Sequence, residues 1–415
     1  MLRLLNGIIP EYFPGEMEGK IRIAGRDSRD LSLEERALLT GTVFQNPRAQ
    51  FFSVDTTGEL AFGVEDRRIA AEEIYRRIDA FVARFSIESL TDRNIFQLSG
   101  GEKQKIACAA VDVEDPDIIL LDEPSSSLDL DAVKHLRDVI HSWKERGKTI
   151  VIAEHRLNYL WDLADQMLVM KDGSVFRAFS GEERDALTDR ELAEMGLRCK
   201  TMEDPSEILL SAITGDSIRL VDFSMRRNRR ELFRFPEMRI AKGKVTALTG
   251  RNGRGKTTLL RGLAGWEKRC RGTLADGSPS YRLKEMRIRS FLVMQDVNHQ
   301  LFTDSVLEEV LISMPEETRR KAMEILCKLH LEQAADRHPM TLSGGEKQRC
   351  ALACGVASWR RLLLLDEPTS GRDYANVSLL AGQLKRMCAE GRTVVFVSHD
   401  SELIHSCCDH CVKLW

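Results

Sequence analysis

The sequence lacks any apolar run that approaches the roughly 18 to 20 residues of a membrane-spanning helix. Apolar runs such as residues 118–121 and 362–365 have the length of buried strands. Residues 1–10 carry one charged side chain and have neither the basic leader nor the small-residue cleavage site of an export signal. We therefore expect a chain that does not cross a membrane and that stays in the cytosol.

An excess of positive charge is also absent. The 61 Lys and Arg residues are outnumbered by 64 Asp and Glu residues, which gives a net charge of -3. Proteins that bind nucleic acids usually present a strong positive field to the phosphates. DNA and RNA are therefore not expected partners.

A framework of paired Cys-x-x-Cys motifs is missing as well. The 10 cysteines are scattered, which in a cytosolic chain indicates reduced and mostly buried thiols. The tail is an exception, because His405, Cys407, Cys408, His410 and Cys411 are crowded together and could bind a soft metal. We favour simple packing, with a helix end that leads into a last strand at 411–414.

What the sequence does contain is a repeat. Three motifs recur at one offset of 244 residues, and such agreement between separated motifs indicates two copies of one domain. Gln45 matches Gln295 at an offset of 250, which a loop of different length explains. The three motifs are Leu-Ser-Gly-Gly-Glu-Lys-Gln at 98–104 and 342–348, Asp-Glu-Pro at 122–124 and 366–368, and a histidine at 155 and 399.

The length and the alternation of elements predict the architecture. A chain of 415 residues is too long for one core, since single cores rarely grow past about 250 residues. In each copy, apolar strand runs that end in carboxylates alternate with helical stretches such as 71–85 and 319–329. This pattern predicts α/β domains with mainly parallel sheets. We assign residues 1–176 and 217–415 to the two domains and residues 177–216, which are polar and helix-prone, to a helical linker.

The second copy contains a phosphate-binding motif. A buried-strand pattern at 245–249 is followed by Gly-x-x-x-x-Gly-Lys-Thr and then by a helical run. The glycines let the backbone wrap a β-phosphate, the helix N-terminus supplies positive potential, and the lysine reaches the β- and γ-phosphates. A glycine turn that merely packs is the weaker alternative. The candidate phosphate ligands are Gly250, Asn252, Gly253, Gly255, Lys256, Thr257 and Thr258.

Two carboxylates follow the neighbouring strand of that copy. The apolar run 362–365 leads into Asp366 and Glu367, and the carboxyl ends of strands are where an α/β domain binds its ligand. Asp366 and the Thr257 hydroxyl are the predicted Mg²⁺ ligands. Glu367 is the predicted general base for the attacking water.

These motifs resemble those of the ABC ATPase superfamily over nearly the whole chain, which implies ABC-type domains that each carry a helical signature subdomain and bind ATP with Mg²⁺. In that family the Leu-Ser-Gly-Gly run caps the γ-phosphate of ATP bound to the opposite domain, so the two domains are expected to pair within the chain. The resemblance implies one site made of Lys256, Thr257, Gln295, Asp366, Glu367 and His399 with Ser99, Gly100 and Gly101, and another made of Gln45, Asp122, Glu123 and His155 with Ser343, Gly344 and Gly345.

The same resemblance gives these residues roles. Glu367 and His399 would be catalytic in the first of these sites, and Glu123 and His155 in the other. The metal ligands would be Thr257, Gln295, Asp366 and Asp122. The segments 126–129 and 370–373 look like the loops that couple the two sites.

A narrower resemblance concerns the segments 45–52 and 295–302, together with Ala-Phe-Gly at 61–63 and Ala-Glu-His-Arg at 153–156. They look like the ATPases of energy-coupling-factor importers, which take up vitamins and cobalt or nickel ions. The implied partners are a transmembrane coupling subunit, docked near Gln45 and Gln295, and a small substrate-binding membrane subunit. The chain would then lie peripherally at the cytoplasmic face of the membrane.

Two departures from the family pattern stand out. Aligning 2–7 with 260–265 leaves the first copy without a phosphate loop, so about forty residues are missing from it. We hypothesise a late start codon or a fragmentary gene, and for the chain as written we expect one competent site and exposed apolar faces. Arg226 stands where the family usually stacks an aromatic ring on adenine; an arginine can stack there, but an exposed hairpin tip is an equal alternative.

Two other functions remain open. One is a soluble tandem ABC ATPase that acts on ribosomes or nucleic acid, although the linker 177–215 is mixed and acidic-leaning where such proteins tend to be basic. The other is a partly inactive regulatory ABC subunit. Both copies retain the carboxylate pair and the histidine, which argues against decay.

Overall fold

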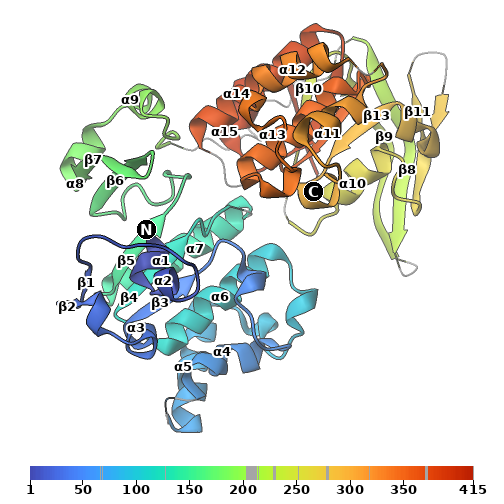
Figure 1. Cartoon of the computed structure of the whole chain (residues 1–415). Helices are drawn as coiled ribbons and strands as arrows, with labels where there is room; N and C mark the ends of the chain where they lie inside the picture. Colours follow the sequence, from blue (N-terminus) through green and yellow to red (C-terminus); the bar gives the residue numbers. More distant parts are fainter. Residues whose placement is uncertain are drawn as a thin grey trace. The chain divides into compact units, whose positions relative to one another are not determined.

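The computed structural model divides the chain into two compact units, Met1–Thr188 and Asp189–Trp415 (Figure 1). The boundary between the units falls inside the predicted linker 177–216. The assignment of that linker as a separate segment stays a prediction. The structure describes residues 1–65, 67, 69–126, 128–201, 213, 215–227, 230–250, 252–276, 280–316, 318–369 and 373–414.

The second unit is built on a parallel sheet of five strands in the order β13-β14-β15-β10-β16. All four neighbouring pairs run parallel, so the carboxyl ends of the five strands lie along one edge. The strands are β10 (Val245–Thr249), β13 (Ser290–Val293), β14 (Leu362–Asp366), β15 (Thr393–Val397) and β16 (His410–Lys413).

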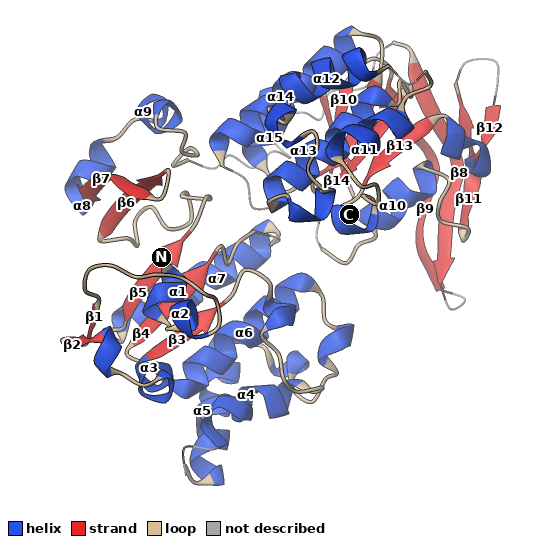
Figure 2. Cartoon of the chain, in the orientation of Figure 1, coloured by secondary structure: helices blue, strands red, loops and turns tan. Residues whose placement is uncertain are grey.

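Both faces of this sheet are covered, because successive side chains of a strand point to opposite sides. In β14, Leu363 and Leu365 belong to the core shared with the helices α11 to α15, whereas Leu362 and Leu364 belong to the core shared with α10 and the antiparallel sheet. Figure 2 shows α11 to α14 on one side of the strands and the antiparallel sheet beyond the other. The helices are α9 (Asp189–Glu194), α10 (Lys256–Leu263), α11 (Val306–Ser313), α12 (Arg319–Lys328), α13 (Gly344–Ala357), α14 (Tyr374–Ala389) and α15 (Ser401–Cys407).

An antiparallel sheet completes the second unit, with the order β12-β11-β8-β9. Its apolar face packs on α10 through buried residues such as Phe223 and Leu274. Its strands are β8 (Ser217–Arg227), β9 (Arg230–Ala241), β11 (Cys270–Ala275) and β12 (Ser280–Arg282), and the 3₁₀ segments of the unit are Leu283–Ile288, Val297–His299, Glu332–Ala334 and Pro339–Thr341.

The first unit repeats part of this plan. Its parallel sheet has three strands in the order β3-β4-β5, and a separate antiparallel pair is formed by β6 and β7. The strands are β1 (Arg22–Ile23), β2 (Arg26–Asp27), β3 (Thr40–Val43), β4 (Ile118–Asp122), β5 (Thr149–Ala153), β6 (Gln166–Lys171) and β7 (Ser174–Ser180).

Helices cover the three-stranded sheet of the first unit. One face packs on α4 to α7 in a single apolar core, and α1 lies against β4. The helices are α1 (Leu2–Leu5), α2 (Ile8–Glu11), α3 (Leu33–Leu39), α4 (Thr56–Glu65), α5 (Ala71–Phe85), α6 (Gly100–Glu114), α7 (Leu130–Glu145) and α8 (Gly181–Ala186), with 3₁₀ segments at Ser28–Asp30, Pro47–Ala49, Glu88–Leu90 and Ile95–Gln97.

These two units confirm the predicted α/β class with mainly parallel sheets. The helix expected at 71–85 is α5, and the strand expected at 245–249 is β10, both with the predicted bounds. The last strand was predicted one residue too late, since β16 runs from His410 to Lys413. The helix after the phosphate loop begins at Lys256, three residues before the apolar run that predicted it.

The two parallel sheets differ next to β5 and β15, where the sheet of the second unit continues for two more strands. In the second unit β10 lies between β15 and β16. In the described residues of the first unit, β5 pairs with β4 and β6 pairs with β7, and no strand occupies the place that β10 holds. As a result β5 is partly exposed along its length, whereas all five residues of β15 are buried. Apolar side chains of the β6–β7 pair are exposed too: Leu168, Met170, Val175 and Phe176.

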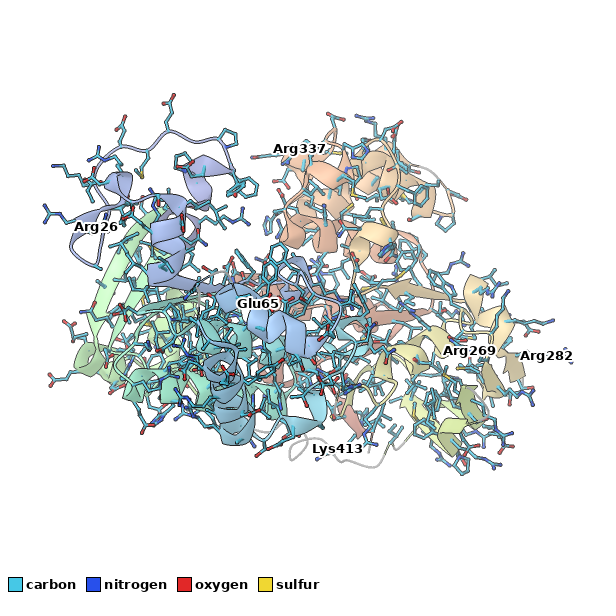
Figure 3. All side chains as sticks on the ribbon, turned by 90° about the horizontal axis from the view of Figure 1, so that it is seen from below. Arg26, Glu65, Arg269, Arg282, Arg337 and Lys413 are labelled. Atoms are coloured by element: carbon cyan, nitrogen blue, oxygen red, sulfur yellow. The ribbon has the colours of Figure 1, made fainter. Side chains whose placement is uncertain are left out.

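No helix among the described residues is both long enough and apolar enough to span a bilayer. Charged side chains lie at the surface of both units. Figure 3 labels six exposed charged side chains: Arg26, Glu65, Arg269, Arg282, Arg337 and Lys413.

The unequal burial of β5 and β15 leads to a first prediction. Val395 in β15 is fully buried, and Val151, the matching residue of β5, is half-buried. Replacing Val395 with alanine should lower the free energy of unfolding by about 2 kcal/mol, because it removes buried methyl groups and leaves a cavity, whereas Val151→Ala should lower it by about 1 kcal/mol or less. Urea unfolding followed by circular dichroism measures both variants, and equal shifts of the two midpoints would contradict the account.

Candidate functional site

The loop between β10 and α10 depends on glycine. Gly250 has φ of 142° and Gly255 has φ of 90°, a region that other residues rarely adopt. A Cβ on Gly250 would lie 2.3 Å from the main-chain oxygen of Leu414. Gly255 is the N-cap of α10, so the first amides of this helix face the loop. This is the strand–loop–helix arrangement that binds phosphates.

Lys256 is the first residue of α10, and its side chain is buried with 6% of the residue exposed. Its Nζ donates to the main-chain oxygen of Gly250 at 2.6 Å and to Oδ1 of Asn252 at 3.3 Å. Burying an ammonium group is costly unless it is well paired. The loop therefore holds a positive charge at the point where a phosphate would lie.

Next to the lysine, a hydroxyl and a carboxylate meet. Oγ1 of Thr257 donates to Oδ1 of Asp366 at 3.0 Å, across α10 and β14. Asp366 is 5% exposed, and this burial raises the pKa of its carboxyl group, against the lowering effect of the bond from Thr257. Hydroxyl and carboxylate oxygens are ligands that suit Mg²⁺. The two residues predicted as metal ligands thus fit such an ion.

Glu367 and His399 lie side by side at the ends of β14 and β15. Nε2 of His399 is 3.6 Å from Oε1 of Glu367 and 3.0 Å from Oδ1 of Asn252. Because an amide oxygen is an acceptor, the second contact requires a proton on Nε2 of the histidine. Glu367 has φ of 47°, and its amide donates to the main-chain oxygen of Val397 at 2.9 Å. Strained backbone of this kind is typical of functional sites.

The first unit brings together the matching residues. Oε2 of Glu123 accepts from Nε2 of Gln45 at 2.8 Å, and its Oε1 lies 3.5 Å from Nε2 of His155. Glu123 repeats the positive φ of its counterpart, at 43°. Burial and the neighbouring Glu123 raise the pKa of Asp122. The described residues of this unit include no glycine-rich phosphate loop.

Gln295 is placed differently from Gln45. Both glutamines are exposed in the turn after their strands, but among the described residues the Gln295 side chain makes no hydrogen bond to Glu367. Its predicted roles as a nucleotide and metal ligand stay predictions.

Both signature segments start a helix with the same capping geometry. Ser99 caps α6, where its Oγ accepts from the amide of Glu102 and the Glu102 carboxylate accepts from the amide of Ser99. Ser343 and Glu346 repeat this at α13. The amides of the following glycines, at 100, 101, 344 and 345, are at helix N-termini, where anions bind. The pairing of each serine with the opposite phosphate site stays a prediction. Arg251 of the phosphate loop, and Ser127 and residues 370–372 of the predicted coupling loops, lie outside the described residues.

Glu154, which precedes His155, is a further residue of this site to which no motif of the sequence assigns a role. Its carboxylate accepts from the amide of Ser125 at 3.3 Å, from the Tyr159 hydroxyl at 2.8 Å and from the amide of His155 at 2.8 Å. It thus ties the loop after Glu123 to the histidine. A charged residue directly after an apolar strand run was the available signal. In the second unit Ser398 takes this position, 3.4 Å from the hydroxyl of Thr369.

Arg226 and the Cys- and His-rich tail were the two features for which the sequence left alternatives open. Arg226 is an exposed residue of β8, with Nη2 3.6 Å from Oε2 of Glu231. In the tail, the Cys407 thiol donates to the main-chain oxygen of Leu403, and Cys411 lies 3.5 Å from Oγ1 of Thr249. Within the described ranges, no three His, Cys, Asp or Glu side chains are arranged to hold a metal ion.

A glycine loop with a buried lysine, a hydroxyl–carboxylate pair and a carboxylate–histidine pair at one sheet edge define a P-loop nucleotide-binding protein of the ABC type, with a second, related unit on the same chain. The chain belongs to the ABC transporter family, whose profile matches residues 1–126 and 235–370. The predicted membership and the predicted ATPase activity are thereby confirmed, and the chain is a tandem ABC ATPase that binds ATP.

Curated relatives agree with this assignment. The chain is 38% identical over 422 residues to a protein of Treponema denticola provisionally named an ABC transporter ATP-binding protein, covering 100% of this chain and 86% of the relative. It is 31% identical over 446 residues to YkoD of Bacillus subtilis, provisionally named an HMP/thiamine import ATP-binding protein, covering 99% of this chain and 81% of the relative.

Solved structures share the fold at lower identity. An RNase-L inhibitor chain has a TM-score of 0.60 at 21% identity, over 88% of this chain and 72% of that chain. A chain from a model of ribosome-bound archaeal Pelota and ABCE1 has a TM-score of 0.65 at 22% identity, over 90% of this chain and 62% of that chain. Likeness at this identity shows the fold alone.

The burial of Asp366 leads to a second prediction. Because its folded-state pKa is raised, the charged carboxylate opposes folding above that pKa, and this opposition disappears as the pH falls below it. Asp366→Asn, whose Oδ1 can still accept from Thr257, should therefore raise the melting temperature at neutral pH while it lowers Mg-ATP turnover. Melting curves from pH 4 to pH 8 should show the gain shrinking toward acid, and a gain that grows toward acid would refute this reading.

Proposed function

We propose that this chain is the ATP-hydrolysing subunit of a membrane importer of the energy-coupling-factor type, with its competent phosphate site in the second domain. The observation that carries the catalytic part is the convergence of Lys256, the Thr257–Asp366 pair and the Glu367–His399 pair on one edge of one sheet. Charge, metal ligands and a positioned base are what phosphoryl transfer to water requires.

In this proposal the glycine loop and the first turn of α10 bind the β- and γ-phosphates. The contributing residues are Gly250, Asn252, Gly253, Gly255, Lys256, Thr257 and Thr258. Thr257 and Asp366, with Gln295, would hold Mg²⁺, which neutralises charge on the phosphate oxygens when bound.

Glu367 is the proposed general base, and His399 holds it in place. The 3.6 Å separation between Nε2 of His399 and Oε1 of Glu367 lets the imidazole orient the carboxylate toward a water beside the γ-phosphate. Asn252 accepts from both Lys256 and His399, and it therefore links the phosphate loop to the base.

The signature turn of the first domain would close this site. The serine and the helix-start amides at Ser99, Gly100 and Gly101 form an anion-binding corner. Bound ATP would then draw the two domains together within the chain. In the other site Gln45, Asp122, Glu123 and His155 would face Ser343, Gly344 and Gly345, where the described residues of the first domain supply no phosphate loop.

Glu367→Gln is the direct test of the catalytic assignment. It removes the base but keeps the shape of the site, so ATP binding should persist and turnover should fall by at least about 10²-fold. Equilibrium ATP binding and phosphate release are the measurements.

Glu123→Gln is the matched variant in the first domain. Because the described residues around Glu123 include no phosphate loop, we expect a smaller loss of turnover than for Glu367→Gln. An equal or larger loss of turnover for Glu123→Gln would contradict the proposal that the competent phosphate site lies in the second domain.

The importer part of the proposal is supported by exposed apolar residues beside each glutamine. Phe52 is 76% exposed and Phe302 is 74% exposed, seven residues after Gln45 and Gln295 respectively. Exposed apolar clusters of this kind mark protein interfaces. The Phe52 ring stacks on Phe62 at 4.9 Å. The other exposed apolar side chains of these segments and of the two signature entrances are Phe62, Phe96, Ile312 and Met340.

These side chains fit apolar helices of a transmembrane coupling subunit, which would in turn hold a small substrate-binding membrane subunit. The chain would then work at the cytoplasmic face of the membrane. The import function in the name of the Bacillus subtilis relative supports this proposal.

A second candidate function is action on the ribosome. It is favoured by the shared fold with the RNase-L inhibitor and with the ribosome-bound protein. The net charge of -3 weighs against it, since ribosomal RNA attracts basic proteins.

Affinity purification from detergent-solubilised membranes separates the two candidates. With wild-type chain we expect the membrane-spanning subunits to co-purify, and Phe52→Asp with Phe302→Asp should reduce their recovery by roughly tenfold or more, because charge is placed in an apolar contact. Leu232→Asp, which changes an exposed apolar residue on the antiparallel sheet, is the control. Recovery of ribosomes in place of membrane subunits would contradict the importer.

A further inference from the structure

A buried arginine joins the segment before the second domain to the loop that carries His399. Arg198 is 6% exposed, and its Nη1 lies 2.9 Å from Oδ2 of Asp400, whose side chain is 2% exposed. Its Nε lies 3.6 Å from Oε2 of Glu402, and the amide of Cys199 donates to Oε1 of Glu402 at 2.5 Å. The segment is therefore attached at two points.

The acidic residue in this contact is coupled to the histidine through the backbone. Asp400 directly follows His399, and its amide donates to Oγ of Ser398 at 3.0 Å. Its Oδ1 accepts from the amide of Leu403 and so caps α15. The Asp400 amide thus closes the turn that contains His399, and the Asp400 carboxylate holds the start of α15 directly after it.

The segment that carries Arg198 is itself folded. The amide of Leu197 donates to the main-chain oxygen of Leu192 at 2.8 Å, at the end of α9. Asp189, at the start of α9, accepts from the amide of Lys200 at 2.9 Å. The guanidinium of Arg198 thus projects from an ordered support.

The first domain has a different arrangement at the matching position. The residue after His155 is Arg156, whose Nη1 donates to the main-chain oxygen of Leu128 at 3.2 Å. A cation in place of Asp400 would repel an arginine such as Arg198. The contact therefore belongs to the histidine loop of the second domain, which is also the domain with the phosphate loop.

We propose that Arg198 is a positioning residue for the second nucleotide site: through Asp400 it holds His399 in line with Glu367, so that the segment before the domain controls the rate of ATP hydrolysis there. The proposal rests on the proposed function, because it gives His399 its role. Arg198 lies outside the P-loop, signature and histidine motifs. The proposal therefore extends the site to α9 and to the residues up to 200 that follow it.

The test compares Arg198→Met with Arg184→Met in the full chain. Arg184 is a matched control, since it is also a buried arginine, with its Nη2 2.8 Å from Asp185, and it lies in the first unit. We expect Arg198→Met to lower kcat for Mg-ATP by roughly tenfold, because small misplacements of a catalytic group are costly, and to change KM by less than about twofold. Arg184→Met should lower the melting temperature and leave kcat close to that of the wild type.

A double-variant cycle shows whether Arg198 acts through the histidine. In single-turnover measurements, adding Arg198→Met to His399→Ala should change the rate by less than about twofold. A tenfold loss in that background would overturn the proposal, as would equal losses of kcat in the two arginine variants. An undiminished rate for His399→Ala alone would instead remove the role of the histidine and so defeat the proposed mechanism itself. Should Arg198→Met not fold, Arg198→Lys keeps the charge without the two-point contact and is compared in the same way.

Discussion

The buried ammonium group of Lys256 is the constraint around which the second domain is arranged. It lies at the start of α10, after the loop that follows strand β10, and is held 2.6 Å from the main-chain oxygen of Gly250. A buried charge must be compensated, and the sheet meets this demand because the neighbouring parallel strands end at the same edge. Asp366 and Glu367 leave β14 there, and His399 follows β15. The strand order thus determines which side chains surround a bound phosphate.

The carboxylate–histidine pair does not depend on the phosphate loop. It is present in both units, at 3.5 Å between His155 and Glu123 and at 3.6 Å between His399 and Glu367. What differs is the enclosure: the His155 side chain is 40% exposed, whereas that of His399 is 9% exposed. The loop before α10 in the second unit contributes to this difference, because Asn252 contacts His399 at 3.0 Å and is itself held by Lys256. Electrostatic interactions are stronger in such an enclosed setting.

Local patterns allowed the fold class and most of the site to be predicted, because the relevant residues are close in sequence or follow a strand. Lys256 and Thr257 open a helix after a glycine loop, and Asp366 ends an apolar run, so their meeting at one edge follows from parallel strands. The different settings of Gln45 and Gln295 could not be predicted, since side-chain orientation in an exposed turn depends on tertiary contacts. The contact of Arg198 with Asp400 joins segments about two hundred residues apart and leaves no local pattern. The sequence also does not show that the Glu154 carboxylate accepts hydrogen bonds from Ser125 and Tyr159, because these contacts depend on the tertiary fold.

The central claim is that ATP bound at Lys256 is closed by the Ser99 turn of the other domain. An experimental structure of the full chain with Mg²⁺ and a non-hydrolysable ATP analogue tests this most directly. The account predicts γ-phosphate oxygens in contact with Nζ of Lys256 and with the hydroxyl or helix-start amides of Ser99, Gly100 and Gly101. A nucleotide seated on the glycine loop with the Ser99 turn remote from it, in a fully occupied site, would contradict the account.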